Sequence, residues 1–227
     1  MKDVLIIDCG PSLSNVSKHF GFAPEWIMES LKNKGCSFTW VKPYNGDKIQ
    51  SNNADAWIIT GSPHSVYDGT DWMVDIEEEM KNIQSSHIPV LGICFGHQLI
   101  AKSFGGKVEL NPNGWELGAY PVQITAAGKK SQLFSGIENY TLVYESHQDS
   151  VTVLPENAIE FARNNKGNQA FIIHDYFYGV QFHPEFSWEV IKMYASIRSA
   201  EGVTVDDPSV PESTEGKLIL HNFINLI

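Results

Sequence analysis

Cys94, which stands between two glycines, is the residue of this chain whose type and position best suit covalent chemistry. It lies in the run Gly92-Ile93-Cys94-Phe95-Gly96, after an apolar stretch (88–93) that is typical of a buried strand in a parallel sheet. A helical pattern begins immediately afterwards. A strand, a tight turn carrying a nucleophile between glycines, and a helix form the arrangement called a nucleophile elbow. The elbow would also place Cys94 at a helix N-terminus, where the backbone dipole favours a thiolate.

A buried structural cysteine is the competing interpretation of that strand, because free cysteines are often buried. The two glycines and the immediate helix favour a nucleophile instead. A base and an orienting acid elsewhere in the chain are needed to decide between the two.

The triplet His183-Pro184-Glu185 supplies both of these groups. It follows an apolar strand pattern at 178–182, so His183 would stand where a strand leaves the sheet. Pro184 fixes one backbone angle between the two side chains. A carboxylate two residues away can then hold the imidazole tautomer and stabilise its protonated form. We therefore predict His183 as the base and Glu185 as its orienting acid, although a histidine at a strand end is often only structural.

A thiolate that attacks a carbonyl group needs hydrogen-bond donors for the developing oxyanion. The elbow offers the backbone N–H of Phe95. Gly61, which follows a predicted strand at 54–60, can offer another because its backbone can approach a ligand closely. An ordinary turn is the alternative for Gly61-Ser62-Pro63. No phosphate-binding loop follows a predicted strand, and the cysteines lack metal-site spacing, so we expect neither a cofactor nor a metal.

The composition of the 227 residues limits the other classes of function. A net charge of −11 argues against nucleic acid or an anionic membrane as the main partner, since both attract basic surfaces. No apolar run approaches the ~18 residues of a membrane span, and no signal segment is evident. Three cysteines, an odd number, fit a reducing compartment. We expect a cytoplasmic protein without a membrane or nucleic-acid partner.

The strand and helix patterns predict the elements that must position these residues. Strands at 3–8, 36–41, 54–60 and 88–93 alternate with helices that begin at Pro24, at Asp71 as N-cap, and after Cys94. This alternation predicts an α/β fold with a doubly wound, mainly parallel open sheet flanked by helices, flavodoxin-like. Short strands between 107 and 183 predict an antiparallel extension or a small flanking sheet. A hairpin is expected across Asp175-Tyr176-Phe177, a helix from a Ser187 cap to about Ser199, a polar surface loop at 201–215, and a final helix at 215–226.

Taken together, these motifs resemble the class I, or triad, glutamine amidotransferase family. Gly92 to Gln98 is similar to its nucleophile motif, His183-Pro184-Glu185 to its His/Glu motif, and Gly61-Ser62-Pro63 stands at its oxyanion loop. The segments 61–68, 114–118 and 146–151 resemble stand-alone members related to the amidotransferase domain of GMP synthase and to γ-glutamyl peptidases. The chain ends soon after its final helix, so we expect a single class I glutamine amidotransferase-like domain over 1–227, without the further domains of GMP synthase.

The resemblance implies roles for individual residues. Cys94 would be the nucleophile, His183 the base and acid, and Glu185 the orienter, with Gly61 and Phe95 as oxyanion donors. Gln98 would help to bind the amino-acid end of the substrate, although a polar helix-capping residue is the alternative. His97 is expected to be a packing residue rather than a ligand. His64 follows the oxyanion loop and, like Glu116 and His147 in their matching segments, has no assigned role, although lining the pocket mouth is one alternative for it.

Three functions are compatible with this pattern. The first is a free-standing hydrolase of glutamine or a related γ-glutamyl compound, a small-molecule substrate, acting through a γ-glutamyl thioester on Cys94. The second is a glutaminase subunit that delivers ammonia to a synthase on another chain. The third is a catalytically idle binding or regulatory member, which the intact Cys94, His183 and Glu185 argue against.

Overall fold

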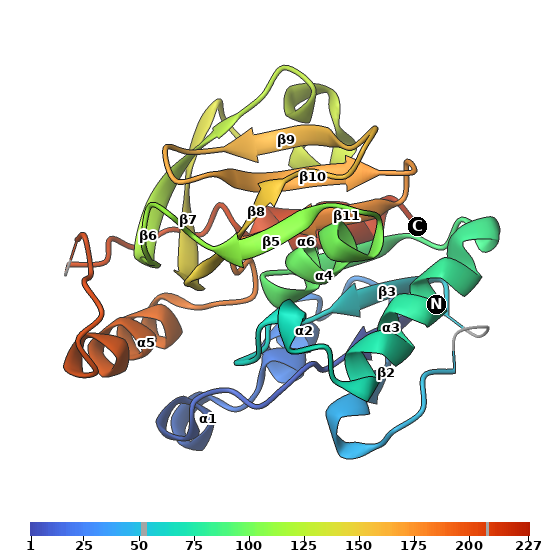
Figure 1. Ribbon diagram of the computed structural model, residues 1–227, viewed down its shortest axis with the longest axis horizontal. Helices are drawn as coiled ribbons and strands as arrows, with labels where there is room; N and C mark the ends of the chain where they lie inside the picture. The colour runs from blue at the N-terminus through green and yellow to red at the C-terminus, as the bar shows by residue number, and fades with distance from the viewer. Residues whose placement is uncertain (51–53, 208) are drawn as a thin grey trace.

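A nine-stranded sheet forms the centre of the computed structural model, which describes residues 1–50, 54–207 and 209–227 (Figure 1). The strand order across the sheet is β2-β1-β3-β4-β11-β10-β9-β6-β7. The strands are β1 (Lys2–Ile7), β2 (Cys36–Val41), β3 (Ala56–Ile59), β4 (Val90–Ile93), β6 (Glu116–Ile124), β7 (Tyr140–His147), β9 (Ile159–Arg163), β10 (Asn168–Ile173) and β11 (Phe177–Val180).

The direction of the strands changes beside β11. Strands β2, β1, β3, β4 and β11 pair in parallel, whereas β10, β9, β6 and β7 continue the sheet in antiparallel pairs. A hairpin joins β10 to β11 with Ile173 opposite Phe177, as predicted. Its turn is 174–176, one residue before the predicted Asp175-Tyr176-Phe177, because Phe177 already belongs to β11. Because β4 and β11 are neighbouring parallel strands, their carboxyl ends meet at one edge of the sheet.

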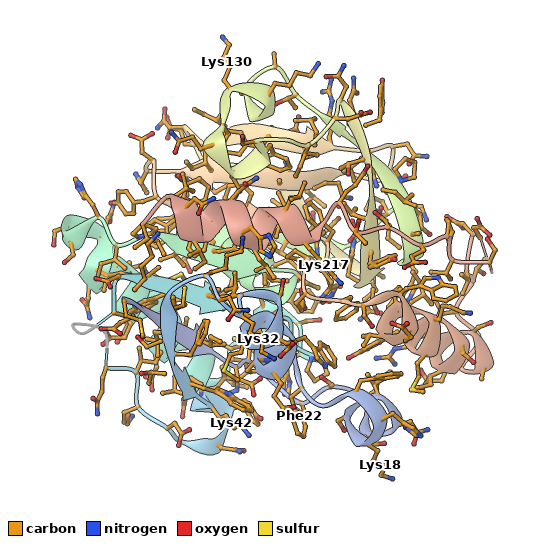
Figure 2. The ribbon with its side chains drawn as sticks, turned by 180° about the vertical axis from the view of Figure 1, so that it is seen from behind. Lys18, Phe22, Lys32, Lys42, Lys130 and Lys217 are labelled. Carbon is orange, nitrogen blue, oxygen red and sulfur yellow. The ribbon has the colours of Figure 1, made fainter. Side chains whose placement is uncertain are left out.

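Helices cover both faces of the parallel part. The α-helices of the described residues are α1 (Ser14–Phe20), α2 (Ala23–Ser30), α3 (Asp71–Asn82), α4 (Phe95–Ser103), α5 (Trp188–Ala200) and α6 (Lys217–Asn225). Side chains of α3 and α4 form one buried cluster with the sheet, and those of α2 and α6 form another on the opposite face. Figure 2, viewed from behind, shows α6 crossing that second face from its start at Lys217.

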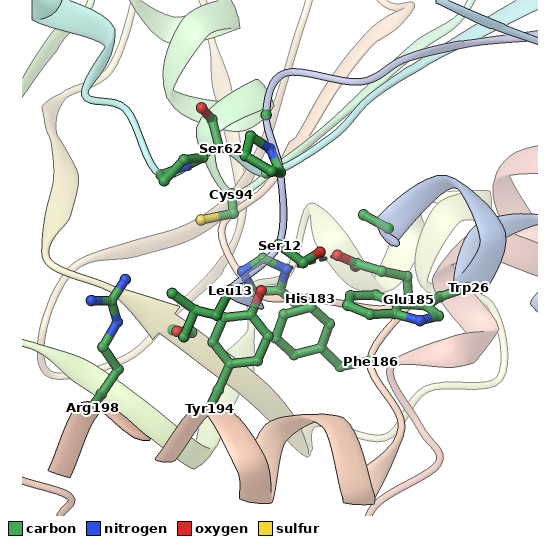
Figure 3. Close-up of a pocket in the computed structure, with 16 residues that line it drawn as sticks. Ser12, Leu13, Trp26, Ser62, Cys94, His183, Glu185, Phe186, Tyr194 and Arg198 are labelled. Atoms are coloured by element: carbon green, nitrogen blue, oxygen red, sulfur yellow. Dashed lines mark hydrogen bonds and ion pairs between the residues drawn. The ribbon is translucent and has the colours of Figure 1, made fainter. Parts of the chain in front are cut away.

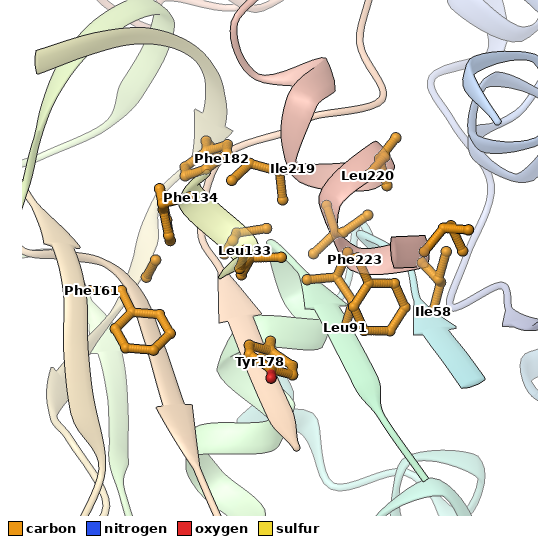
Figure 4. Close-up of a cluster of buried hydrophobic side chains, with 14 of the residues drawn as sticks. Ile58, Leu91, Leu133, Phe134, Phe161, Tyr178, Phe182, Ile219, Leu220 and Phe223 are labelled. Atoms are coloured by element: carbon orange, nitrogen blue, oxygen red, sulfur yellow. The ribbon is translucent and has the colours of Figure 1, made fainter. Parts of the chain in front are cut away.

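Successive side chains of a strand point alternately into the two buried clusters. In β1, Val4 and Ile6 lie in the cluster with α2 and α6, while Leu5 and Ile7 lie in the cluster with α3 and α4. This is the two-residue period of a strand that is buried on both faces. Figure 4 shows α6 packed over β3 and β4, with Phe223 between them. Full burial of a side chain of this size contributes roughly 1.5–3 kcal/mol.

Helix α5 lies outside this double layer, near the carboxyl ends of the strands. It begins where the Ser187 hydroxyl accepts a hydrogen bond from the backbone N–H of Val190 at 3.3 Å, as predicted. Its buried side chains pack with α1, β6 and β7 in a third cluster. This packing places α5 beside the sheet edge where β4 and β11 end.

The predicted fold class is confirmed, with local differences. Both alternatives for the antiparallel part occur, because β5 (Lys107–Leu110) and β8 (Asp149–Val153) form a separate small sheet beside the extended main sheet. The predicted N-cap at Asp71 is wrong by one residue. Thr70 has the extended backbone of an N-cap (φ −70°, ψ 154°), and Asp71 is the first helical residue. In the 201–215 loop, Val210 is buried rather than exposed. No helix among the described residues is long and apolar enough to cross a membrane.

Candidate active site

Cys94 occupies a strained turn between β4 and α4. Its backbone angles are φ 51° and ψ −100°, a region that L-residues seldom adopt and that costs of order 1–3 kcal/mol. The surrounding sheet holds this conformation, since the Cys94 N–H donates to the carbonyl of Val180 on β11 at 2.9 Å. The predicted strand, tight turn and helix are therefore all present.

Close backbone contacts explain the two glycines. A Cβ atom on Gly92 would lie 2.4 Å from the carbonyl carbon and oxygen of Gly96, and one on Gly96 would lie 2.4 Å from the carbonyl oxygen of Ile59. Any side chain at either position would push α4 away from β3 and β4. The glycines thus allow the helix to return directly over the strand and hold Cys94 at its N-terminus.

His183 stands beyond the end of β11, next to the elbow. Its backbone N–H donates to the carbonyl of Tyr144 on β7 at 2.8 Å, and its Nδ1 lies 2.8 Å from Oε1 of Glu185. The ring is stacked on Phe186 with centroids 4.0 Å apart. Both His183 and Glu185 are buried. The ring is therefore fixed by a carboxylate on one edge and by an aromatic face.

The electrostatic setting of His183 favours its charged form. Burial by itself lowers the pKa of an imidazole, but the charges of Glu185 and Cys94, together with hydrogen bonds to both, raise the pKa of His183 to about 10. The imidazole is thus protonated at neutral pH while it faces the sulfur. A charged imidazole beside a cysteine is the setting in which proteins activate a sulfur nucleophile.

Gly61 lies directly against these two residues. A Cβ atom built on it would be 3.0 Å from Cε1 of His183 and 3.8 Å from Cβ of Cys94. The backbone of Gly61 therefore lies beside Cys94 and His183, and Phe95 follows Cys94 as the first residue of α4. The structure brings together all five predicted residues of the reaction centre.

Two hollows meet above Cys94. The first extends toward the aromatic side chains of Trp26, Phe186 and Tyr194, and it also contains His183 and Glu185 (Figure 3). The second extends over Phe95 and Gln98 toward β8. The residues that border the second hollow but not the first are His64, Ser65, Phe95, Gln98, Trp115, His147, Gln148 and Asp149. A substrate that places a carbonyl carbon at Cys94 would have one part in each hollow.

Gln98 borders the second hollow, but its side-chain amide is engaged within the protein. Its Nε2 donates to the carbonyl of Asp149 at 2.9 Å and to Oε1 of Gln181 at 3.2 Å. The Asp149 carboxylate in turn accepts hydrogen bonds from Ser65 Oγ at 2.6 Å and Tyr67 Oη at 3.1 Å. These bonds tie the wall of the second hollow to α4 and to the loop after β3.

His97 is a packing residue, as expected, and His64 lies at the pocket, which is the alternative that the sequence leaves open for it. His64 borders the second hollow, with its Nδ1 3.5 Å from Oδ2 of Asp68. His97 is fully buried behind the elbow, where its ring packs against Phe171 and Gly179. Burial, aided by the charge of His147, lowers the pKa of His97 to about 3, so this ring is neutral.

A second buried group of ionisable residues lies behind the pocket wall. Nε2 of His147 is 3.1 Å from Oε2 of Glu145 and 3.3 Å from Oε2 of Glu116. Its Nδ1 bonds to the Asp149 carbonyl at 2.9 Å. Burial opposes protonation of His147, but hydrogen bonds and charges from Glu116 and Glu145 raise its pKa well above the ordinary value. The ring is therefore an imidazolium between two carboxylates.

The two carboxylates of this group differ. Burial acts to raise the pKa of Glu116, but His147 and the side-chain amides of Asn164 and Gln169 outweigh burial and lower it. Glu145 has no amide donor among the described residues, and burial raises its pKa to about 7. The ligand atoms of the trio lie within 4.8 Å of one another, a spacing that could hold a metal ion. Among the described residues, His147 and the amides of Asn164 and Gln169 are the donors to Glu116.

The residues that α5 contributes to the pocket are not evident from the sequence. Tyr194 and Arg198 both line the first hollow, and Arg198 also lines the second. The sequence indicated only a helix in this region, because neither residue belongs to a motif. Their position depends on how α5 packs against α1, β6 and β7, which no local pattern in the chain encodes.

Comparison with known proteins places this geometry in a family. The family model "Glutamine amidotransferase class-I" matches residues 20–194. γ-Glutamyl peptidase 4 of Arabidopsis thaliana is 34% identical over 84% of this chain and 78% of its own length. γ-Glutamyl peptidase 3 of the same plant is 32% identical, and this chain spans 60% of it. GMP synthase of Clostridium kluyveri is 39% identical over 63% of this chain, which spans only 26% of that enzyme.

Solved structures share the fold of this chain. A glutamine amidotransferase from Thermotoga maritima aligns over 99% of this chain and 96% of its own, with a TM-score of 0.76 and 21% identity. A glutamine amidotransferase from Methylobacillus flagellatus aligns over 99% of this chain and 95% of its own, with a TM-score of 0.76 and 22% identity. At these identities the structures establish the fold alone. With the family match over most of its length, the chain belongs to the class I glutamine amidotransferase family.

Proposed function

We propose that this chain hydrolyses the side-chain amide of glutamine or of a related γ-glutamyl compound, with Cys94, His183 and Glu185 as its catalytic residues. One observation carries the proposal: a strained cysteine at a helix N-terminus shares a pocket with a histidine that a buried glutamate holds. Family membership supports an amidohydrolase, and the γ-glutamyl peptidase relatives support a γ-glutamyl substrate.

The proposed reaction begins with a proton on His183 and a thiolate at Cys94. The thiolate attacks the amide carbon, and the backbone N–H groups of Gly61 and Phe95 stabilise the oxyanion. His183 gives its proton to the nitrogen as the carbon–nitrogen bond breaks, and ammonia or an amine leaves. Water, deprotonated by His183, then cleaves the γ-glutamyl thioester to release glutamate. Glu185 keeps the ring oriented throughout.

The two hollows suggest how the substrate lies. The leaving nitrogen must face His183, so the amine side belongs in the first hollow and the glutamyl side in the second. We propose that Gln98, on the wall of the second hollow, helps to bind the amino-acid end, directly or by holding the Asp149 carbonyl in place. We further propose that residues 1–227 act as one cytoplasmic domain on a small-molecule substrate, without a cofactor, membrane or nucleic-acid partner.

Delivery of ammonia to a synthase is the second candidate. It is favoured by the similarity to GMP synthase, of which this chain spans about a quarter. In that case the partner would be a separate synthase chain, and glutamine would be hydrolysed fully only in the complex.

A substrate screen on the purified chain tests these alternatives. L-glutamine and a γ-glutamyl dipeptide are supplied separately, and released ammonia and amine are measured for the wild type, Cys94→Ala and the control Cys36→Ala. We expect the wild type and the control to turn over at least one substrate without a partner, and Cys94→Ala to turn over neither. Activity that appears only with an added synthase would favour the ammonia-delivery role. If no substrate is hydrolysed and a glutamine-analogue electrophile leaves Cys94 unmodified, the chain is an idle family member.

A further inference from the structure

Arg198 on α5 is a charged residue at the junction of the two hollows. It lines both of them, as do Ser62, Pro63, Cys94 and Ser146. Figure 3 shows its side chain rising from α5 on the side of the pocket toward which the Cys94 sulfur points. Among the described residues that border the hollows, Arg198 is the only arginine or lysine.

One N–H group of the Arg198 guanidinium binds Glu201, whereas the N–H of its Nε has no partner among the described residues. Its Nη1 donates to Oε2 of Glu201 at 2.8 Å, and its Cζ lies 5.7 Å from the centre of the Trp115 ring. Its Nε is buried and has no hydrogen-bond acceptor within the described part of the chain. A buried N–H without a partner is unfavourable, so this donor is suited to an acceptor that arrives with a ligand.

A carboxylate is the group that fits such an edge. The fork of guanidinium N–H groups matches the two oxygens of a carboxylate, and arginine carries its charge at every pH of interest. The chain as a whole has a net charge of −11, so an arginine at the pocket stands out as a selective feature for an anionic ligand. Glu201 neutralises part of this charge, but it binds at Nη1, away from Nε.

We infer that Arg198 binds a carboxylate of the substrate and thereby selects γ-glutamyl compounds in their anionic form. This inference rests on the proposed function, since it concerns the same pocket. Such substrates contain a carboxylate on the glutamyl group, and a γ-glutamyl dipeptide has a second one on the amino acid that leaves. Because Arg198 borders both hollows, it can bind either the carboxylate of the glutamyl group or that of the leaving amino acid.

Steady-state kinetics with two substrates identify which carboxylate is bound. γ-Glutamylglycine has a carboxylate on its leaving group, whereas γ-glutamyl methylamide has none. In Arg198→Gln we expect KM to rise about tenfold to a hundredfold while kcat changes little, because a charge-assisted pair is lost. A rise for both substrates assigns the glutamyl carboxylate, and a rise for γ-glutamylglycine alone assigns the leaving-group carboxylate. A rise of less than twofold for both overturns the inference.

Matched variants separate this role from stability and from general charge. Lys192→Gln removes one positive charge from the exposed face of the same helix, where Lys192 lies over Trp188, and should leave KM unchanged. Arg198→Lys keeps the charge but loses the fork, and should recover part of the lost affinity. Thermal unfolding of each variant checks that the fold is intact. A rise in KM in Lys192→Gln equal to that in Arg198→Gln would contradict a specific contact.

Measuring ligand binding to an inactive variant tests the Arg198 contact separately from the proposed hydrolysis. Calorimetric titration of γ-glutamylglycine into Cys94→Ala, and into Cys94→Ala with Arg198→Gln, requires no turnover. Binding that weakens at least tenfold with the second substitution supports the carboxylate contact even if the wild type hydrolyses neither substrate. Equal binding by the two proteins overturns the contact even if the wild type is an active hydrolase.

Discussion

His183 and His147 are two buried histidines held by glutamate carboxylates in neighbouring parts of the molecule. The backbone of His183 is anchored to the Tyr144 carbonyl, and the next residue on that strand, Glu145, belongs to the His147 group. Both imidazoles have raised pKa values because of adjacent carboxylates. His183, however, faces the sulfur of Cys94 across the pocket, whereas Nε2 of His147 faces two carboxylates.

The difference shows what distinguishes a candidate base from a structural ion pair. Burial and a carboxylate partner raise the pKa in both cases, so a shifted pKa alone does not identify the reacting group. What sets His183 apart is its place at the end of β11, beside the parallel strand that ends in the elbow. We therefore expect substitution of His183 to act mainly on turnover and substitution of His147 to act mainly on the free energy of unfolding.

Replacement of the first histidine should have the largest effect on turnover. His183→Asn removes the proton donor and acceptor, and we expect kcat/KM for a γ-glutamyl substrate to fall by about 10²–10⁴-fold. Because Glu185 is buried and loses its cation, some loss of stability should accompany the loss of turnover. Activity assays with a parallel thermal melt provide the check. Activity within tenfold of the wild type would remove His183 from the proposed reaction.

Replacement of the second histidine should act on stability instead. His147→Asn leaves Glu116 and Glu145 buried together without their cation, and breaking a buried ion group of this kind costs about 3–5 kcal/mol. Urea unfolding monitored by circular dichroism measures the free energy of unfolding directly. A variant as stable as the wild type would show that the His147 group does not hold the wall behind the pocket.

The glutamate beside His183 should control the pH range of activity. The charge of Glu185 helps to raise the pKa of His183 to about 10, and the protonated ring is the form that donates to the leaving nitrogen. Activity should therefore persist with rising pH and be lost as the pH passes about 10. In Glu185→Gln this loss should move to lower pH, with a tenfold or larger fall in kcat. An unchanged alkaline limb in the pH profile of kcat/KM would contradict this coupling.

The smallest effect is expected at Glu145. Burial raises its pKa to about 7, so its carboxyl stays protonated in the folded chain at pH values where it is ionised in the unfolded chain. This contribution to stability is present at acidic pH and is lost as the pH rises through about 7. Glu145→Gln is neutral at every pH, so its Tm should fall less than that of the wild type between pH 5.5 and 8.5. Equal falls in Tm would show that Glu145 does not titrate in this range.

The same comparison explains how far the sequence could be interpreted. Cys94, His183 and Glu185 could be predicted because each is part of a short local pattern: a glycine-flanked turn after an apolar strand, and a triplet after another. The parallel sheet followed from its alternating strands and helices. The His147 group could not be predicted, because Glu116 and Glu145 come from antiparallel strands whose pairing no local pattern specifies. Arg198 was missed for a similar reason, since only the packing of α5 brings it to the pocket.

Detection of the acyl-enzyme is the most direct test of the central claim that Cys94 is the nucleophile. The wild type is mixed with a γ-glutamyl substrate, quenched in acid within its first turnovers, digested and analysed by mass spectrometry, with Cys94→Ala treated in parallel. We expect one γ-glutamyl group on the peptide that contains Cys94, none on the peptides that contain Cys9 or Cys36, and none in the variant. Turnover without this adduct at any time point, or turnover that survives in Cys94→Ala, would contradict the account.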